Sequence, residues 1–371
     1  MKVNLYEVRN GALMDQKDQV NQEINPQLIF TFGNLKELQD EQNQSLLKST
    51  FPNADIVYCT SVGQIVMNEI SNEVLSVTAI EFSSTQTKSL CLNISDYATK
   101  EEARIAIANQ IKTEELSHIL LFVDGMNVNP TEVLSCINEI TQNKICITGG
   151  LASDEARFED ASIGLNEKPK PGKIIAIGFY GDKIHIHHST CGGWEVFGMP
   201  KTVTKQEQNI LFEIDDQPAL DLYKEYLGKY VEGLPQSALF FPLAILNMDN
   251  ENILTRTILS VDHANKSLIF AGDMPQGSKI QFMKSTLNKL IEASENADMI
   301  VKTKNTSQVI DYVLAISCVG RKLVLKHRID EEVEKLYNIF GENTKLSGFY
   351  SHGEVAPFSN GSTSFFCKTK P

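Results

Sequence analysis

The stretch LSGFYSHGEVAP, residues 346–357, carries residue types from which a small-ligand site can be built. Gly353 can adopt a positive φ, which would let Ser351 and Glu354 point back toward the end of the preceding strand. A carboxylate there could hold a ligand ammonium group, and a hydroxyl or backbone N–H could hold a ligand carboxylate. The alternative is an ordinary turn in which Glu354 caps the neighbouring backbone.

A second stretch, ITGGLASD at residues 147–154, offers hydroxyls, a carboxylate and two glycines after a strand pattern. Gly149 and Gly150 permit close approach of the backbone to a ligand. The spacing matches neither GxxxxGK[ST] nor GxGxxG, so it does not indicate a nucleotide site. The polar side chains of this loop are those of Thr148, Ser153 and Asp154.

Two large side chains outside these loops are further candidates. Arg321 follows the apolar run at residues 312–319 and could ion-pair with Glu354 or bind an anionic ligand; the alternative is a solvated surface arginine. Trp194, the only tryptophan, could wall a pocket or close a domain interface.

Metal and nucleophile chemistry find weaker support. His185 and His187 share one face of a strand expected at residues 183–188. One strand face supplies at most two of the four ligands that zinc needs. We therefore expect that His185, His187 and His188 bind no metal. Cys59 or Cys318 would need a nearby base to act as a nucleophile. The motif residue available for that role is His352, and we do not expect a Cys/His enzyme.

A haem-binding site is the alternative to a ligand site that holds no cofactor. An axial ligand could come from His352, His118 or His327, but the chain has no CxxCH attachment sequence.

Composition limits the possible partners. The 371 residues carry a net charge of -13 without a Lys/Arg cluster, which argues against nucleic acid and anionic membranes. Seven scattered cysteines without a CxxC pair favour reduced thiols. The N-terminus lacks the apolar stretch of a signal peptide, and no apolar run is long enough to span a bilayer. We expect a cytoplasmic protein.

Helix and strand patterns alternate along the chain, which predicts a mixed α/β fold. Capping residues and apolar faces predict helices over residues 99–111, 129–140, 216–228 and 330–341. Asp216 is the expected N-cap of the third helix. Apolar or alternating runs predict strands at residues 27–32, 54–59, 75–82, 118–123, 144–148, 173–180, 183–188, 237–246, 312–319 and 346–350.

A repeat is visible in this order. Three times a strand, a helix and a second strand are followed by a loop of small hydroxyl residues and glycine, over residues 27–65, 118–154 and 312–357. Such units give parallel strands, and α/β proteins bind ligands at the carboxyl ends of these strands. We therefore expect the loops at 59–64, 148–154 and 351–357 to lie near a shared cleft.

The chain resembles the FIST family (F-box and intracellular signal transduction domain). The stretches that carry the resemblance are CTSVGQI (59–65), GGLASDEARF (149–158), CGGWEVFG (191–198), residues 203–228, FAGDMPQGSKIQFM (270–283), AISCVGR (315–321) and GFYSHGEVAPFSNGSTSF (348–365). The resemblance implies an N-terminal module at 1–202 and a C-terminal module at 203–371. It also implies a sensor for a small ligand, amino acids having been proposed, while some bacterial members resemble haem-based nitric oxide sensors.

Two positions depart from the family pattern. Gly63-Gln64 stands where Gly-Glu is usual. Near the C-terminus the family has a His-Asn pair before a threonine, and here Ser359 precedes Asn360, with Thr363 later. This chain therefore lacks the family's glutamate at position 64 and its histidine at position 359, and any role of those two side chains.

We interpret the chain as a non-enzymatic sensor of a small polar metabolite that signals to a separate protein, such as a histidine kinase or cyclase. A haem nitric oxide sensor is the first alternative, and a hydrolase or transferase using the same pocket is the second. The expected ligand-binding residues are Cys59, Thr60, Ser61, Gly63, Thr148, Gly149, Gly150, Trp194, Arg321, Tyr350, Ser351, His352, Gly353, Glu354 and Asn360.

Overall fold

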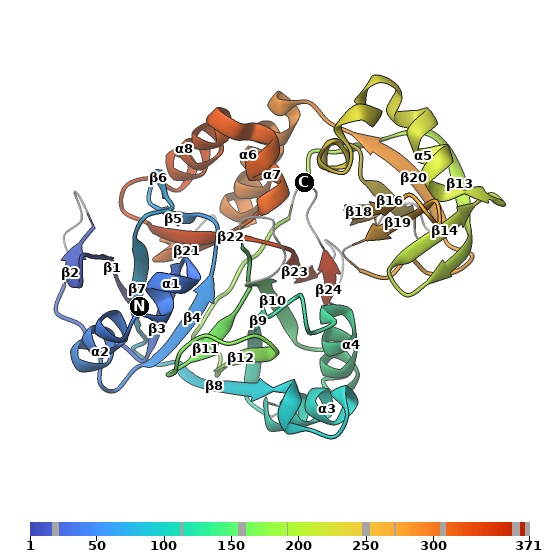
Figure 1. Cartoon of the computed structure of the whole chain (residues 1–371). Helices are drawn as coiled ribbons and strands as arrows, with labels where there is room; N and C mark the ends of the chain where they lie inside the picture. The colour runs from blue at the N-terminus through green and yellow to red at the C-terminus, as the bar shows by residue number, and fades with distance from the viewer. Residues whose placement is uncertain are drawn as a thin grey trace. The chain divides into compact units, whose positions relative to one another are not determined.

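The computed structural model describes residues 1–16, 22–111, 114–154, 161–190, 192–246, 253–270, 272–304, 309–357 and 364–367. Contacts divide the chain into two compact units (Figure 1). Unit 1 comprises residues 1–190, 297–319 and 330–366, and unit 2 comprises residues 191–296, 320–329 and 367–371. Unit 1 is discontinuous in sequence because the last strands of the chain pair with strands from its first half, and the modules 1–202 and 203–371 expected from the sequence stay a prediction.

The elements of unit 1 form three sheets with helices, which confirms the α/β class. They are β1 (Lys2–Arg9), β2 (Ala12–Asp15), β3 (Leu28–Gly33), α1 (Leu35–Gln39), α2 (Glu41–Thr50), β4 (Asp55–Thr60), β5 (Gln64–Val66), β6 (Glu69–Ser71), β7 (Leu75–Glu81), β8 (Gln86–Asn93), η1 (Ile94–Asp96), α3 (Lys100–Ile111), β9 (Leu116–Val123), α4 (Pro130–Ile140), β10 (Cys146–Leu151), β11 (Ile163–Leu165), β12 (Lys173–Tyr180), β21 (Tyr312–Cys318), α8 (Ile329–Phe340), β22 (Lys345–Ser351), β23 (Glu354–Pro357) and β24 (Ser364–Cys367).

A parallel strand pair is present in each sheet of unit 1. The strand orders of these sheets are β11-β4-β3-β7-β1-β2, β24-β23-β10-β9-β12-β8 and β21-β22-β5-β6. The parallel pairs are β3 with β4, β9 with β10, and β21 with β22. Helices α1 and α2, α4, and α8 lie between the members of these pairs along the chain. The three strand–helix–strand repeats expected from the sequence are therefore present.

The repeats exchange strands in a closed ring. After its second strand, each repeat adds its next strand antiparallel to the second strand of another repeat: β5 pairs with β22, β23 with β10, and β11 with β4. The register is equivalent each time, with Gln64 opposite Phe349, Glu354 opposite Gly150 and Ile163 opposite Cys59. No repeat can therefore complete its sheet alone.

Aromatic side chains fill the place where the three repeats meet. The ring of Phe349 lies 4.7 Å from that of Phe32 and 5.9 Å from that of Phe122, and Phe32 and Phe122 are 6.3 Å apart, between centroids. These separations are typical of favourable aromatic pairs. One side chain from each repeat thus contributes to a common core.

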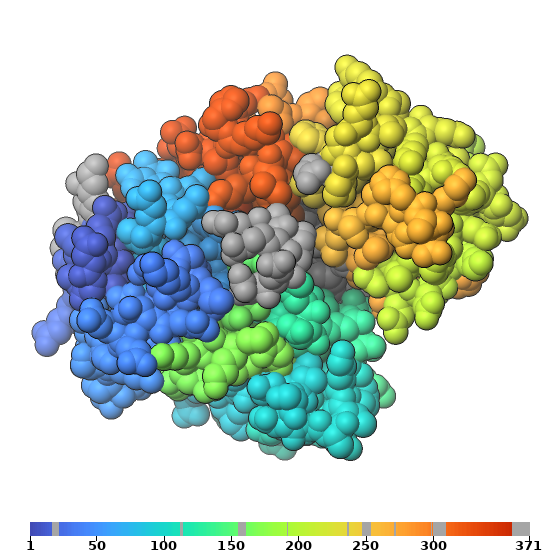
Figure 2. Space-filling model, in the orientation of Figure 1, coloured from blue at the N-terminus to red at the C-terminus, as the bar shows by residue number. Residues whose placement is uncertain are grey.

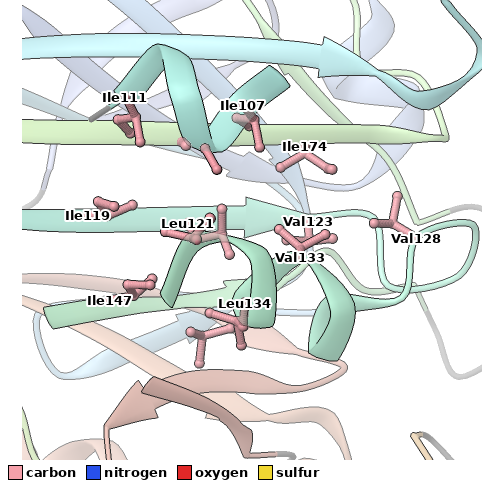
Figure 3. Packing of buried hydrophobic residues seen from close by; sticks show 14 of the residues in the cluster. Ile107, Ile111, Ile119, Leu121, Val123, Val128, Val133, Leu134, Ile147 and Ile174 are labelled. Atoms are coloured by element: carbon pink, nitrogen blue, oxygen red, sulfur yellow. The ribbon is translucent and has the colours of Figure 1, made fainter. Parts of the chain in front are cut away.

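Helices α3 and α4 pack on the sheet that contains β9. Figure 3 shows Ile107 from α3 and Val133 from α4 in one cluster with Leu121 of β9, and all three are fully buried. Burying one such side chain stabilises the fold by about 1.5–3 kcal/mol. The two helices lie side by side on the surface (cyan and green in Figure 2), and an ion pair of 2.6 Å joins Arg104 to Glu132.

Unit 2 is built on an eight-stranded antiparallel sheet in the order β17-β16-β20-β13-β14-β19-β18, with β15 paired to β14. Its elements are β13 (Glu195–Glu207), β14 (Ile210–Ile214), β15 (Gln217–Pro218), α5 (Ala219–Leu227), η2 (Gly228–Gly233), η3 (Gln236–Phe240), β16 (Leu243–Leu246), β17 (Ile253–Arg256), β18 (Ile258–Asp262), β19 (Ser267–Phe270) and β20 (Lys279–Lys284). Three further helical segments are α6 (Leu287–Lys304), α7 (Val319–Leu325) and η4 (Lys326–Arg328).

Three local predictions were wrong. Residues 183–188 form no strand; the run alternates correctly but gains no neighbouring strand. The strand expected at 237–246 begins as the 3-10 helix η3, and only Leu243–Leu246 is extended. Asp216 does not cap α5, because its positive φ of 61° places it in the turn between β14 and β15, and Pro218 is the N-cap.

Candidate functional site

Two turns of unit 1 have the same sequence pattern, Ser-x-Gly, and the same geometry. The Ser61 hydroxyl accepts a bond from Gly63 N (3.2 Å) and lies 2.7 Å from Gly63 O. The Ser351 hydroxyl accepts from Gly353 N (3.0 Å) and lies 2.5 Å from Gly353 O. A serine that bonds to the backbone two residues ahead forms a tight turn by itself. These turns connect β4 to β5 and β22 to β23.

Each serine also bonds to the second strand of another repeat. Tyr350 N donates to the Ser61 hydroxyl (3.0 Å), and Leu151 N donates to the Ser351 hydroxyl (2.9 Å). Ser153 completes the set: its N–H donates to Thr60 O (2.9 Å), and its hydroxyl donates to Tyr350 O. The three loops therefore meet in space, whereas the shared cleft expected between them stays a prediction.

An aspartate, a histidine and a glutamate are buried at this junction. Asp154, His352 and Glu354 are 7%, 5% and 4% exposed. His352 Nε2 lies 3.4 Å from Asp154 Oδ1, which makes an ion pair when the imidazole is protonated. Removing charged groups from water costs several kcal/mol each, so such a concentration in a packed junction calls for a compensating role.

The two glycines of β10 serve packing between strands. A Cβ on Gly149 would lie 1.9 Å from Leu121 O of β9, and a Cβ on Gly150 would lie 2.8 Å from Ile316 Cγ2. The same occurs in another repeat, where a Cβ on Gly348 would lie 1.9 Å from Ala315 O. The structure thus explains both glycines without a ligand, whereas the sequence suggested close approach to one.

The remaining polar residues of these loops bond to the protein itself. The Thr60 hydroxyl accepts from Ser162 N at 2.9 Å, and the Thr148 hydroxyl lies 2.8 Å from His118 Nε2. Cys59 is fully buried, and this burial raises the pKa of its thiol far above the ordinary value. A thiol in that state is a poor nucleophile at neutral pH.

Arg321 and Trp194 belong to unit 2, and both are buried. Arg321 is 3% exposed and donates to Gly192 O (3.0 Å), Leu290 O (2.6 Å) and the Ser294 hydroxyl (2.7 Å). The exposed-arginine alternative is therefore wrong, and Arg321 lies in α7 rather than in a strand-end loop. Its pairing with Glu354 stays a prediction, as does a pocket wall at Trp194.

The histidines proposed as metal or haem ligands lie in different environments. His185, His187 and His327 are exposed. His118 is buried, and this lowers the pKa of its imidazole to about 3. Among the described residues, no group of three or more His, Cys, Asp or Glu side chains has a geometry suited to a metal ion. Asn360 lies outside the described residues.

Three residues of the junction were absent from the expected binding set. Ser153 and Asp154 follow the paired glycines in the same loop, so their place in the repeat could have identified them. Gln64 is equivalent in register to Glu354 and is fully buried. Within the part of the chain that the structure describes, no helix has the length and apolarity needed to cross a bilayer.

Comparison with known proteins identifies two domain models in the chain. The FIST N domain matches residues 27–217, and the FIST C domain matches residues 219–357. The chain is also similar to the uncharacterized protein MJ1623 of Methanocaldococcus jannaschii, with 25% identity over 231 residues. That match covers 58% of this chain and 43% of the relative, so the chain spans under half of the relative's length.

Proposed function

Since the chain belongs to the FIST family, we propose that it is a sensory protein that binds a small polar ligand and passes the signal to a separate protein. FIST domains are associated with signal transduction and small-ligand sensing. In this proposal the protein acts in the cytoplasm, and its partner is a signalling enzyme such as a histidine kinase or a cyclase. The site binds its ligand without converting it.

The observation that carries this proposal is the buried set of Asp154, His352 and Glu354, where the three repeats meet. Two of these groups are carboxylates and one is an imidazole. A packed junction has no structural need for so many ionisable groups, since apolar residues of similar volume stabilise a core as well or better. Buried groups of ionisable side chains of this kind are candidates for a functional site.

The charges also favour one class of ligand. Carboxylates form strong hydrogen bonds with an ammonium group, and a protonated imidazole can bind a carboxylate. Glu354 supplies the first kind of contact and His352 the second. An amino acid or a similar small zwitterion carries both groups, so we propose this class as the ligand.

The expected behaviour of Glu354→Gln tests the proposal. The substitution keeps the shape and removes the charge, and one charge-assisted hydrogen bond contributes about 1.5–3 kcal/mol. Affinity should therefore fall by about ten- to a hundredfold, with little change in the melting temperature. Native mass spectrometry of the purified protein identifies the bound molecule, and titration calorimetry with that molecule and with amino acids measures the affinity.

A matched control is Glu342→Gln, which removes the same charge from an exposed turn of unit 1 and should alter neither quantity. A backbone-capping role for Glu354 gives the opposite pattern. In that case Glu354→Gln lowers the melting temperature and leaves the affinity unchanged, and the proposed site is lost.

A further inference from the structure

The first strand of each repeat offers two edges, and the third repeat leaves one of them open. β3 lies between β4 and the antiparallel β7, and β9 lies between β10 and the antiparallel β12. β21 has β22 on one side and, within the described part of the chain, no strand on the other (Figure 1). The open edge thus lies where the other two repeats hold an antiparallel strand.

This edge lacks the features by which proteins prevent strands from pairing. Natural edge strands are short, or carry charged residues, prolines or bulges. β21 is seven residues long, YVLAISC, without charge, proline or glycine. Elsewhere in unit 1, β2 and β6 are edge strands of four and three residues, and the edge strand β8 contains Lys88. Among the described strands of unit 1, β21 is therefore a long apolar edge without charge or proline.

We propose that β21 pairs antiparallel with β21 of a second copy of this chain, which forms a two-fold symmetric dimer. An antiparallel strand is the partner that the equivalent edges of β3 and β9 hold. A strand that pairs antiparallel with its own copy obeys a two-fold axis, so the assembly closes at two. Because β21 carries no charge, the pairing opposes no like charges.

The backbone of β21 fixes the register of this pair. The Ala315 carbonyl points toward β22, since a Cβ on Gly348 would lie 1.9 Å from Ala315 O. Backbone groups alternate in direction along a strand, so those of Leu314 and Ile316 point to the open edge. A pair centred on Ala315 joins Leu314 of one copy to Ile316 of the other by two hydrogen bonds. It also sets the two Ala315 side chains opposite each other, with Cα atoms about 4.5 Å apart.

The contact is small, and this sets the concentration range of the test. Seven residues of strand extend about 23 Å. Such an interface falls well below the roughly 1,600 Å² of a standard stable complex, so the dimer should dissociate in the micromolar range. Sedimentation equilibrium from about 1 to about 500 µM covers this range.

The wild-type mass should rise with concentration from 41.4 kDa toward twice that value. Ala315→Lys sets two ammonium groups across the axis and should stay monomeric, whereas a mixture of Ala315→Lys and Ala315→Asp should form a mixed dimer. The matched control Thr87→Lys adds the same charge to the edge strand β8 and should dimerise as the wild type does.

A second measurement needs no variant. Amide hydrogen exchange at Leu314 and Ile316 should slow as the wild-type concentration rises, while exchange at Ala315, whose backbone faces β22, should not change. A wild-type protein that is monomeric at every concentration overturns the proposal. Exchange at Leu314 and Ile316 that is independent of concentration, or association beyond two copies, overturns it as well.

Discussion

Gln64 of the first repeat occupies the position that Glu354 occupies in the third repeat. Replacing Gln64 by glutamate tests whether the first repeat tolerates a carboxylate at this position. Gln64 is fully buried, and its amide nitrogen is assigned toward Ser71 O (2.5 Å) and Val74 O (3.2 Å), because the opposite assignment sets an oxygen against both carbonyls. Gln64→Glu keeps the shape, but an ionised carboxylate only accepts hydrogen bonds. The carboxyl group must therefore stay protonated in the folded protein.

The magnitude follows from the pKa that this environment imposes. Buried glutamates reach a pKa of about 8–9, against about 4.3 in the unfolded chain. For an acid with a raised folded-state pKa, stability is fully present below the unfolded pKa and falls as pH rises toward the folded one. The loss is about 1.4 kcal/mol per pH unit, so Gln64→Glu should be about 3–4 kcal/mol less stable at pH 7 than at pH 4.3, relative to wild type.

Urea unfolding of both proteins at several pH values between about 4 and 8 measures this difference. The control is Gln86→Glu, the same substitution at an exposed position of β8, where the difference should be small and nearly independent of pH. A constant difference for Gln64→Glu across the range, or none at pH 7, refutes the reasoning. It would mean that a hydrogen-bond donor, not two carbonyls, faces the side chain.

Two further substitutions test the packing and titration of unit 1. Gly149→Ala sets a Cβ 1.9 Å from Leu121 O and should cost about 2–4 kcal/mol in urea unfolding, whereas Gly181→Ala, at a positive φ in open space, should cost about 1 kcal/mol. Equal costs would contradict the steric explanation. Burial lowers the pKa of His118 from 6.5 to about 3, so the unfolded chain binds a proton first and stability falls as pH drops from about 6.5 toward 3. His118→Gln should flatten this fall, and parallel pH profiles for the two proteins would show that another group causes it.

The sequence allowed the repeats to be predicted, because a strand, a helix and a second strand follow one another within short segments such as residues 27–60. It did not allow the strand exchange to be predicted, because that exchange joins residues far apart. Ser61 and Tyr350, for example, bond across 289 residues. The same holds for the site: the loop motifs were visible, but the approach of Asp154 to His352 depends on the packing of two repeats.

Local rules were wrong where tertiary structure supplied a competing interaction. Asp216 has the side chain of a good N-cap, yet the short pairing of β15 with β14 moves the helix start to Ala219. Residues 183–188 alternate like a strand, but alternation gives no partner strand. Arg321 lay next to a strand end in the sequence, and its three acceptors come from two distant segments.

The ring of exchanged strands has a consequence for biosynthesis. β5 is complete by residue 66, but β22, the strand that receives it, is not made until residue 351. At about 5–20 residues per second, that delay is about 15–60 s, during which the nascent chain keeps unpaired strand edges exposed. Residues 191–296, which form most of unit 2, are synthesised within this interval and do not need the later strands for their sheet. Unit 2 can therefore fold on the ribosome while unit 1 waits, and chaperones would be needed chiefly to protect the open edges of β5 and β10, which receive β22 and β23 last.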